Sequence, residues 1–170
     1  MSEVSEYREA KDAFFRDDPG SPLTAEQRKA FQGLRYYPED PALALRLRPE
    51  VFASPEVLEM ETSTGDTQTY LRWAKVSFEV DGRPAELTLY RSPDGAIFLP
   101  FQDANAGGET YGAGRYLEVE ELPGGEVLLD FNMAYNPFCA YNDAWSCPLP
   151  PPENRLRVAI RAGEMTFEQG

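Results

Sequence analysis

Short runs of alternating apolar and polar residues, separated by turn sequences, dominate the chain after Tyr37. In the run ALALRLRP, Leu43, Leu45 and Leu47 fall on one face and the intervening residues on the other. A period of two is typical of a strand that buries one face. The sequence therefore predicts a body of short β-strands.

The later runs add two local predictions. In QTYLRWAKVSFEV the apolar residues change parity between Trp73 and Val76, so we expect a β-bulge near Ala74 or Lys75. Asp81-Gly82 has the residues of a two-residue hairpin turn. Further strands are predicted in the runs EVLEMETS, RPAELTLYRS, AIFLPF, RYLEVEEL, EVLLDFN and RLRVAIRAG.

One pairing can be tested. If the strands at residues 43–48 and 58–61 pair, their arginines and glutamates meet as cross-strand ion pairs, each worth about 0.2–1 kcal/mol. Arg46 and Arg48 would then lie on the surface of the sheet rather than in an anion site.

Two helices are predicted before the strands. Thr24 followed by Gln27 is a capping box that starts the second helix, and Gly33 is expected to end it. The first helix spans Ser2 to about Asp17, where one face repeats at helical spacing. That face is formed by Val4, Tyr7, Lys11, Phe14 and Phe15. We expect both helices to pack on the sheet.

These elements predict an α+β, mostly β fold, with an antiparallel sandwich or partly closed barrel of about eight or nine strands and two N-terminal helices packed on it. No internal repeat or linker divides the chain. We therefore expect one domain over residues 1–170, with a helical N-terminal cover at 1–37 and a β-rich body at 38–170.

The net charge of the chain limits which kinds of partner it can bind. The net charge is −13, from 29 acidic and 16 basic residues, and only Lys11, Lys29 and Lys75 are lysines. Such a charge repels phosphate backbones and anionic membranes, so we expect neither nucleic acid nor membrane as a partner. Two explanations of this composition stay open: adaptation to a salt-rich cytoplasm, as in a halophile, or a GC-rich genome that encodes Arg in place of Lys.

The sequence also favours a cytoplasmic protein. No apolar run approaches the roughly 18 residues of a membrane span. The N-terminus is charged and amphipathic, unlike a secretory signal.

The chain contains no histidine. Ser-His-Asp and Cys-His catalysis, histidine metal triads and a histidine pH switch are therefore excluded. If the protein is an enzyme, its acid and base must be carboxylates, tyrosine, cysteine, lysine or metal-bound water.

Two segments depart from the alternating pattern, and loops on a rigid sheet often carry function. The first, Leu99 to Leu117, is called here the glycine-rich loop. The second runs on from Asp130 and includes the proline- and aromatic-rich segment at 134–156, called here the arch. Their motifs PFQDANAGGETYGAGRYLEV, LDFNMAYNPFCAY and CPLPPPENRLRVAIRAGE stand out, together with FLPF.

These motifs resemble the bacterial and archaeal family catalogued as domain of unknown function 1684, over roughly Phe14 to Phe167. The resemblance implies a single-domain protein without an established activity, substrate or cofactor. The chain departs from the expected family pattern at Asn105-Ala106, Phe138 and Met165. If a hydroxyl at position 105 matters in other members, this protein must use the Asn105 amide instead.

The glycine-rich loop supplies candidate site residues between glycines that allow close approach of a ligand. It lacks the Lys-Ser/Thr of a phosphate loop and the βαβ context of a dinucleotide site. Its candidates are Asp103 and Glu109 as acid, base or metal ligands, and Tyr111 and Arg115 as ligand-binding residues.

The second segment adds Asp130 as a catalytic or metal-ligating candidate. Its ligand-binding candidates are Asn132, Tyr135, Asn136, Asn154 and Arg155. If the segments meet, three chemistries are open: oxygen ligands for Mg²⁺ or Ca²⁺, an acid–base pair as in histidine-free glycosidases, or an arginine clamp for a small carboxylate or phosphate. The alternative is that these side chains only support the architecture.

Cys139 and Cys147 are separated by seven residues. Two thiols without histidine make a poor zinc site. A disulfide, a pair of buried thiols or a carboxylate-paired thiolate stay open.

The candidate residues are compatible with two functions. The first is a binding domain for a small polar or anionic molecule or an ion, with a histidine-free hydrolase as a variant. The alternative is a noncatalytic interaction or oligomerisation domain, for which a homodimer is the simplest form.

Overall fold

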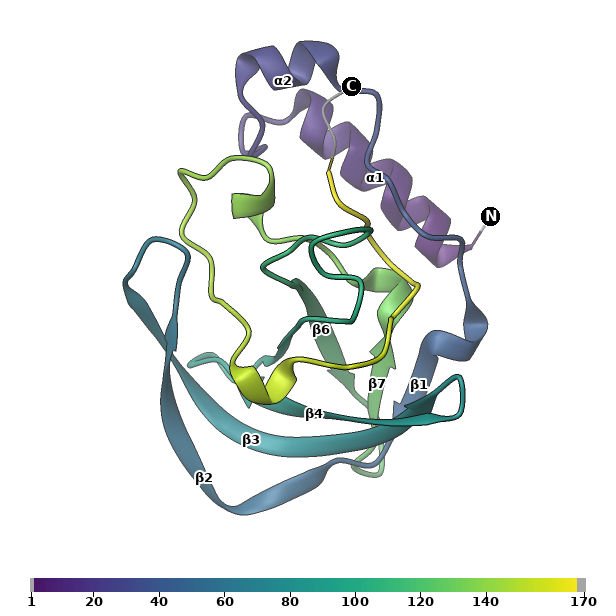
Figure 1. The fold of residues 1–170 in the computed structure, drawn as a ribbon, viewed down its shortest axis with the longest axis vertical. Helices are drawn as coiled ribbons and strands as arrows, with labels where there is room; N and C mark the ends of the chain where they lie inside the picture. Colours follow the sequence, from purple (N-terminus) through teal and green to yellow (C-terminus); the bar gives the residue numbers. More distant parts are fainter. Residues whose placement is uncertain (1, 168–170) are drawn as a thin grey trace.

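Seven antiparallel strands form one strongly curled sheet that resembles half of a barrel (Figure 1). The computed structural model describes residues 2–167. Neighbouring strands follow the order β1-β7-β6-β5-β4-β3-β2. The strands are β1 (Ala44–Leu47), β2 (Glu50–Glu61), β3 (Thr67–Val80), β4 (Arg83–Arg91), β5 (Ile97–Phe101), β6 (Arg115–Glu121) and β7 (Val127–Asp130).

The predicted β-rich fold is confirmed, but the strand count of eight or nine was too high, because the run at 155–161 leaves the sheet. Its chain passes beside the end of β5, with Leu156 N–H donating to the Gln102 carbonyl (2.7 Å). Farther on, its carbonyl groups turn toward the side chain of Arg115 instead of a neighbouring strand.

The predicted pairing of residues 43–48 with 58–61 is wrong. β1 pairs with β7, and β2 pairs with β3, so β1 and β2 lie at opposite ends of the strand order. Only Arg48 and Pro49 separate these two strands, and the chain runs on between them without reversing. The two strands therefore occupy the two edges of the curled sheet, rather than forming a hairpin.

The local predictions for β3 are confirmed. Its register with β4 shifts between Arg72 and Ala74, which is the expected bulge. The turn from β3 to β4 is Asp81-Gly82, both with positive φ (52° and 77°), as a tight hairpin turn requires.

The helices also begin where the sequence predicts. α1 (Glu3–Asp17) is capped by Ser2, and α2 (Ala25–Ala30) begins with the Thr24–Gln27 capping box. Four short 3₁₀ turns complete the elements: η1 (Pro41–Leu43), η2 (Phe131–Met133), η3 (Phe138–Ala140) and η4 (Pro152–Asn154). Among residues 2–167, no helix has the length and apolarity that crossing a membrane requires.

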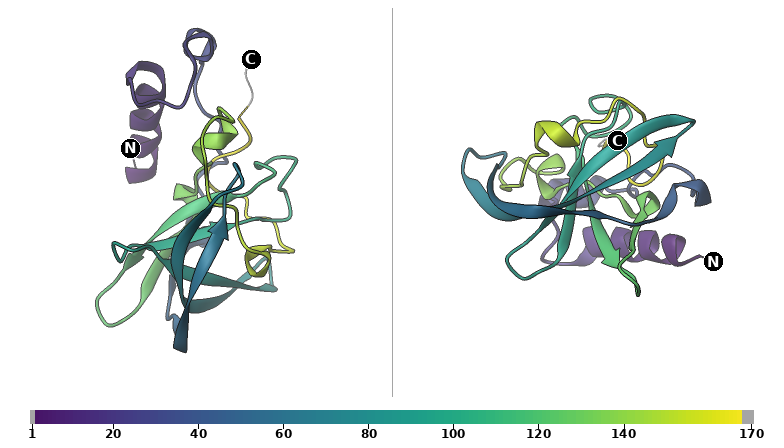
Figure 2. Two further views of the ribbon diagram at one scale, coloured as in Figure 1. Left: turned by 90° about the vertical axis from the view of Figure 1, so that its left-hand side faces the viewer. Right: turned by 90° about the horizontal axis from the view of Figure 1, so that it is seen from below.

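α1 lies across one end of the molecule and α2 beyond it, as Figures 1 and 2 show. Rather than lying flat on the sheet, α1 packs largely against the arch and the C-terminal segment. Its buried Phe15 contacts the rings of Phe31, Phe138 and Tyr141.

The main core lies between the curled sheet and the segments that fill its concave side. Leu89, Leu99, Leu129 and Phe131 are fully buried there, and Ile160 reaches the same cluster from the C-terminal segment. The side chains on the inward face of the strands therefore supply most of the apolar area whose burial stabilises the fold.

Candidate functional site

Arg115, a ligand-binding candidate, is buried at the start of β6 and is only 1% exposed. Its guanidinium donates to three main-chain carbonyls: those of Ala162 (2.5 Å), Glu164 (3.1 Å) and Ile160 (2.9 Å). Burial lowers its pKa, and the charge of Asp103 opposes that change. The side chain thus holds the C-terminal segment against the sheet.

Asp103 faces the same segment and is also buried. Its carboxylate accepts from the Thr110 hydroxyl (2.7 Å) and the Ile160 N–H (2.8 Å), and it lies 3.7 Å from the Arg115 guanidinium. The Ile160 contact ties the glycine-rich loop to the C-terminal segment, and the other two hold the loop itself together. The Asp103–Arg115 pair is therefore placed to support the architecture.

Glu109 lies apart from this pair, on the exposed side of the glycine-rich loop. Its carboxylate accepts from the Tyr37 hydroxyl (2.8 Å) and the Asn105 amide (3.1 Å). Asn105 also donates to the Tyr37 oxygen (3.2 Å). The Asn105 amide thus joins Glu109 and Tyr37 in one hydrogen-bonded cluster.

The three asparagine candidates are all buried and bridge chain segments. Asn132 holds the Asp40 N–H and carbonyl (2.8 and 2.9 Å). Asn154 holds the N–H and carbonyl of Thr88 and also donates to the Pro100 carbonyl, each at 2.8 Å. These side-chain amides thus make hydrogen bonds to the backbone of other segments, as a neighbouring strand would.

Asn136 belongs to a buried ion pair that sequence reasoning missed. Its amide donates to Glu164 (2.9 Å), whose other oxygen accepts from Lys11 of α1 (2.6 Å). Glu164 is fully buried, and that burial raises its pKa despite the charge of Lys11. The position of Lys11 within the apolar face of the first helix was the signal that could have revealed it.

The arch begins after η2, ends just beyond η4 and is fixed at several points. The Tyr116 hydroxyl donates to the Pro148 carbonyl, and Leu149 N–H donates to the Glu61 carbonyl (2.8 Å). Glu153 accepts both the Tyr90 hydroxyl and a forked contact from Arg72. The prolines therefore carry the chain past the end of β2, as a stiff connection.

Arg155 and Tyr111, two more ligand-binding candidates, lie apart from each other. Arg155 is exposed and lines a cavity of about 410 Å³ between β2 and the prolines of the arch. The Tyr111 hydroxyl lies 3.8 Å from the sulfur of Cys139, and burial raises its pKa. Both cysteines are buried free thiols.

Residues 2–167 contain no preformed set of ligands for the expected Mg²⁺ or Ca²⁺. Within residues 2–167, no three or more Cys, Asp or Glu side chains converge in a way that could hold a metal ion. Asp103 is engaged by Arg115, and Glu109 lies on the exposed side of the loop. The two segments meet, but their carboxylates serve different contacts.

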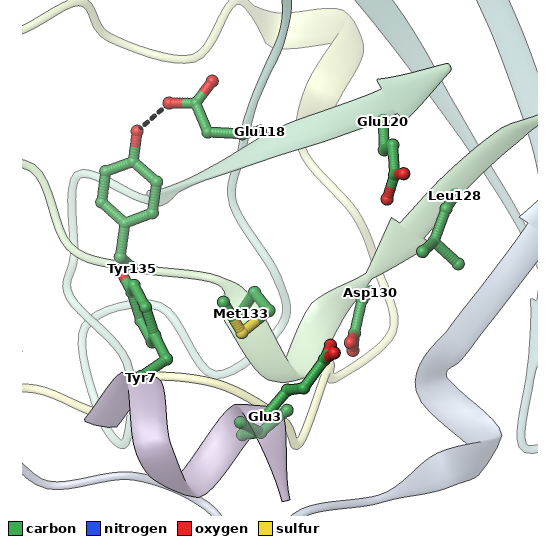
Figure 3. A pocket seen from close by; sticks show the side chains of 9 residues that line it. Glu3, Tyr7, Glu118, Glu120, Leu128, Asp130, Met133 and Tyr135 are labelled. Atoms are coloured by element: carbon green, nitrogen blue, oxygen red, sulfur yellow. Dashed lines mark hydrogen bonds between the residues drawn. The ribbon is translucent and has the colours of Figure 1, made fainter. Parts of the chain in front are cut away.

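Asp130 and Tyr135 line a separate cavity of about 320 Å³ between α1 and the strands β6 and β7 (Figure 3). We call it the acidic cavity. Its lining consists of Glu3, Val4, Tyr7, Glu118, Glu120, Leu128, Asp130, Met133 and Tyr135. Among these described residues, four are acids and none is Lys or Arg.

Two of the four carboxylates have fixed positions. The Tyr135 hydroxyl donates to Glu118, as the dashed line in Figure 3 shows. Burial and the charge of Glu118 raise the pKa of Tyr135, which keeps this hydroxyl protonated. Asp130 accepts from the N–H and the amide of Asn132 (3.1 and 2.9 Å).

The other two carboxylates, Glu3 and Glu120, have neither a hydrogen bond nor an ion pair to any other described residue. In Figure 3 the side chain of Glu3 extends from α1 toward the carboxylate of Asp130. A positive charge placed between these groups would be attracted by all of them. The acidic cavity is therefore chemically suited to a cation.

Comparison with known proteins adds a structural relative. An uncharacterised protein of Haloarcula marismortui, solved by solution NMR, is 41% identical to this chain. The match covers 96% of this chain and 92% of the other, with a TM-score of 0.73. No curated protein matches the sequence.

A family match covers most of the β-rich body as well. The family described as "Protein of unknown function (DUF1684)" matches residues 29–165, from the end of α2 to the C-terminal segment. This range contains every candidate residue proposed from the sequence. The chain belongs to this family, as its glycine-rich loop and arch predict.

Proposed function

We propose that the protein binds a small organic cation in the acidic cavity. The observation that carries this proposal is the composition of the lining: four carboxylates, two tyrosines and three apolar side chains. Ligand sites are commonly concave and largely apolar, with a few polar groups that fix orientation. The proposal differs from the expectation that Arg115 binds an anionic group.

The size of the cavity limits the ligand. At about 320 Å³, it has room for about ten waters at roughly 30 Å³ each. Val4, Leu128 and Met133 would contact an apolar portion, and the carboxylates would receive an ammonium group. A compact aryl- or alkylamine has both parts.

The tyrosine rings support the same choice of ligand. Aromatic faces attract cations by about 0.5–2 kcal/mol, and both Tyr7 and Tyr135 line the cavity. Lys11 already approaches the Tyr135 ring, with Nζ 5.2 Å from its centroid. Its charge is paired with Glu164, which reduces its repulsion of a second cation.

The contacts of the candidate carboxylates favour a function in binding without catalysis. Asp103, the acid–base candidate in the glycine-rich loop, is engaged by Arg115, Thr110 and the Ile160 N–H. Asp130 and Glu118 each accept hydrogen bonds that fix them beside the cavity. The fixed carboxylates suit recognition of a charge, and we assign no hydrolytic step to them.

Isothermal titration calorimetry with three probes of matched shape tests the proposal: 2-phenylethylammonium, 2-phenylethanol and phenylacetate. We expect the ammonium to bind more tightly than the alcohol, and phenylacetate not to bind. Added salt should weaken ammonium binding, because screening shortens the reach of the carboxylates. Equal binding of the three probes, or preference for phenylacetate, would refute the proposal.

Variants locate the site. Glu118→Gln/Asp130→Asn should weaken ammonium binding about tenfold, equivalent to about 1.4 kcal/mol, and leave 2-phenylethanol binding unchanged. The matched control Glu9→Gln/Glu56→Gln also removes two acids, both exposed and outside the cavity lining. An equal loss of ammonium affinity in the control would show that binding depends only on the net charge of the protein.

A second candidate function, homodimerisation, is favoured by one observation at the sheet edge. β2 is an edge strand, and its Val51 and Val57 are 51% and 69% exposed. Exposed apolar edges are templates for strand pairing. Light scattering should then show a dimer that Val57→Lys converts to a monomer, whereas a wild-type monomer at all concentrations contradicts it.

We also propose that the protein is cytoplasmic and adapted to high salt. Two free thiols suit a reducing compartment. The net charge of −13 and the 41% identity to a protein of Haloarcula marismortui, a halophile, support salt adaptation. Unfolding curves recorded across KCl concentrations should show stability rising with salt into the molar range.

A further inference from the structure

The two cysteines of the arch lie close together, outside the lining of the acidic cavity. Cys139 sits in η3, and its N–H donates to the sulfur of Cys147 (3.3 Å). This hydrogen bond places the Cys147 sulfur against Cys139, although seven residues separate the two cysteines in the chain.

Hydroxyl groups surround this pair on the side of the glycine-rich loop and the β2–β3 turn. The Tyr111 hydroxyl lies 3.8 Å from the Cys139 sulfur, and the Ser63 hydroxyl accepts from the Cys147 N–H (3.1 Å). The neighbouring Cys147 thiol and the Tyr111 hydroxyl lower the pKa of Cys139 to about 6, against the effect of burial. The pKa of Cys147 is raised in turn, by the neighbouring Cys139 and by burial.

The pKa values of the two thiols thus shift in opposite directions, that of Cys139 downward and that of Cys147 upward. This favours Cys139 as the thiolate of the pair and Cys147 as the thiol that keeps its proton. A thiolate is the reactive form of cysteine. A neighbouring thiol can then resolve the oxidised product as a disulfide.

The backbone of Cys147 is held against the turn between β2 and β3, whereas the chain between the two cysteines is exposed. Ser63 N–H donates to the Cys147 carbonyl (2.9 Å), and Cys147 N–H donates to the Ser63 hydroxyl (3.1 Å). Residues 143–146 of the arch are exposed, and Trp145 contacts the ring of Phe138.

We propose that Cys139 and Cys147 are a reversible oxidation site whose substrate is a hydroperoxide. The Cys139 thiolate attacks one peroxide oxygen, the O–O bond breaks, and the released alkoxide or hydroxide takes up a proton. Cys139 becomes a sulfenic acid. The Cys147 sulfur then attacks it, and the hydroxyl leaves with the Cys147 proton as water, giving the disulfide. A small thiol reductant restores both thiols by exchange.

Mass spectrometry of the native protein after hydrogen peroxide treatment tests this proposal. We expect the wild type to lose two hydrogens and to become resistant to alkylation after denaturation, and a reductant to reverse both changes. Cys147→Ser should instead accumulate a sulfenic acid at Cys139 that dimedone traps. Cys139→Ser should react much more slowly.

The alkylation rate of the native protein is a second test, and its main result comes from the wild type. Alkylation of the native protein should label Cys139 before Cys147, and its rate should reach a plateau at a lower pH than that of an unstructured cysteine peptide. Tyr111→Phe should shift this plateau to higher pH. Native thiols that react with peroxide only after unfolding, or that yield no disulfide, would overturn the proposal.

Discussion

Replacing Arg115 by methionine removes the guanidinium that joins β6 to the C-terminal segment. Three carbonyls then lose their charged donor, and Asp103 stays buried without a neighbouring positive charge. Removing one partner of a buried ion pair costs about 3–5 kcal/mol. Since a domain of this size is stable by about 5–15 kcal/mol, Arg115→Met should lose a large part of that margin.

Urea unfolding followed by tryptophan fluorescence measures this loss. Arg155→Met is the matched control, because Arg155 is exposed, and its change should stay within about 0.5 kcal/mol. Arg115→Lys keeps the charge but lacks the planar fork, so its loss should fall between the two.

A double variant isolates the contribution of charge. Asp103→Asn/Arg115→Met removes both charges and keeps hydrogen-bonding capacity at position 103. It should be more stable than Arg115→Met alone, because the unpaired buried carboxylate is gone. A loss below about 1 kcal/mol in Arg115→Met, or a double variant no more stable than the single, would refute the structural role of Arg115.

Three further predictions concern other buried contacts. Asn154→Ala leaves three buried backbone groups without a partner and should cost at least about 3 kcal/mol in urea unfolding; Asn142→Ala, which loses one exposed contact, is its control. Because burial raises the folded-state pKa of Glu164, the folded protein holds its proton to higher pH, so the unfolding free energy should fall as pH rises through that pKa. Glu164→Gln should lack this fall in otherwise parallel pH profiles; identical slopes would contradict it. Oxidation of the two cysteines, which closes a nine-residue loop, should stabilise the protein by about 2.6 kcal/mol, measured with and without reductant; no difference would argue against a disulfide.

Local features of the fold could be predicted from the sequence because short-range chemistry decides them. The Thr24 capping box, the Asp81-Gly82 turn and the bulge near Trp73 each depend on a few neighbouring residues. The alternation of apolar residues also identified the inward face of β6 and β7, where Leu117, Val119, Val127 and Leu129 are buried.

Long-range arrangements could not be predicted in the same way. Residues 155–161 alternate like a strand, yet their carbonyls face Arg115 rather than a neighbouring strand, and nothing in a period of two shows that. The acidic cavity brings together α1 and the β6–β7 strands, which lie about a hundred residues apart in the chain. Asp130 and Tyr135 were identified as candidates, whereas Glu118 and Glu120 look like ordinary outward residues of a strand.

An NMR titration with 2-phenylethylammonium tests cation binding in the acidic cavity most directly, because it reports both binding and its location. We predict saturable shifts in the amide signals of α1, β6, β7 and η2 around the acidic cavity, and none of comparable size in the glycine-rich loop. We also predict that Leu128→Trp, which fills the cavity, abolishes these shifts while the rest of the spectrum stays folded. Shifts centred on Arg115 or Arg155, or no saturable shifts at all, would contradict cation binding at this site.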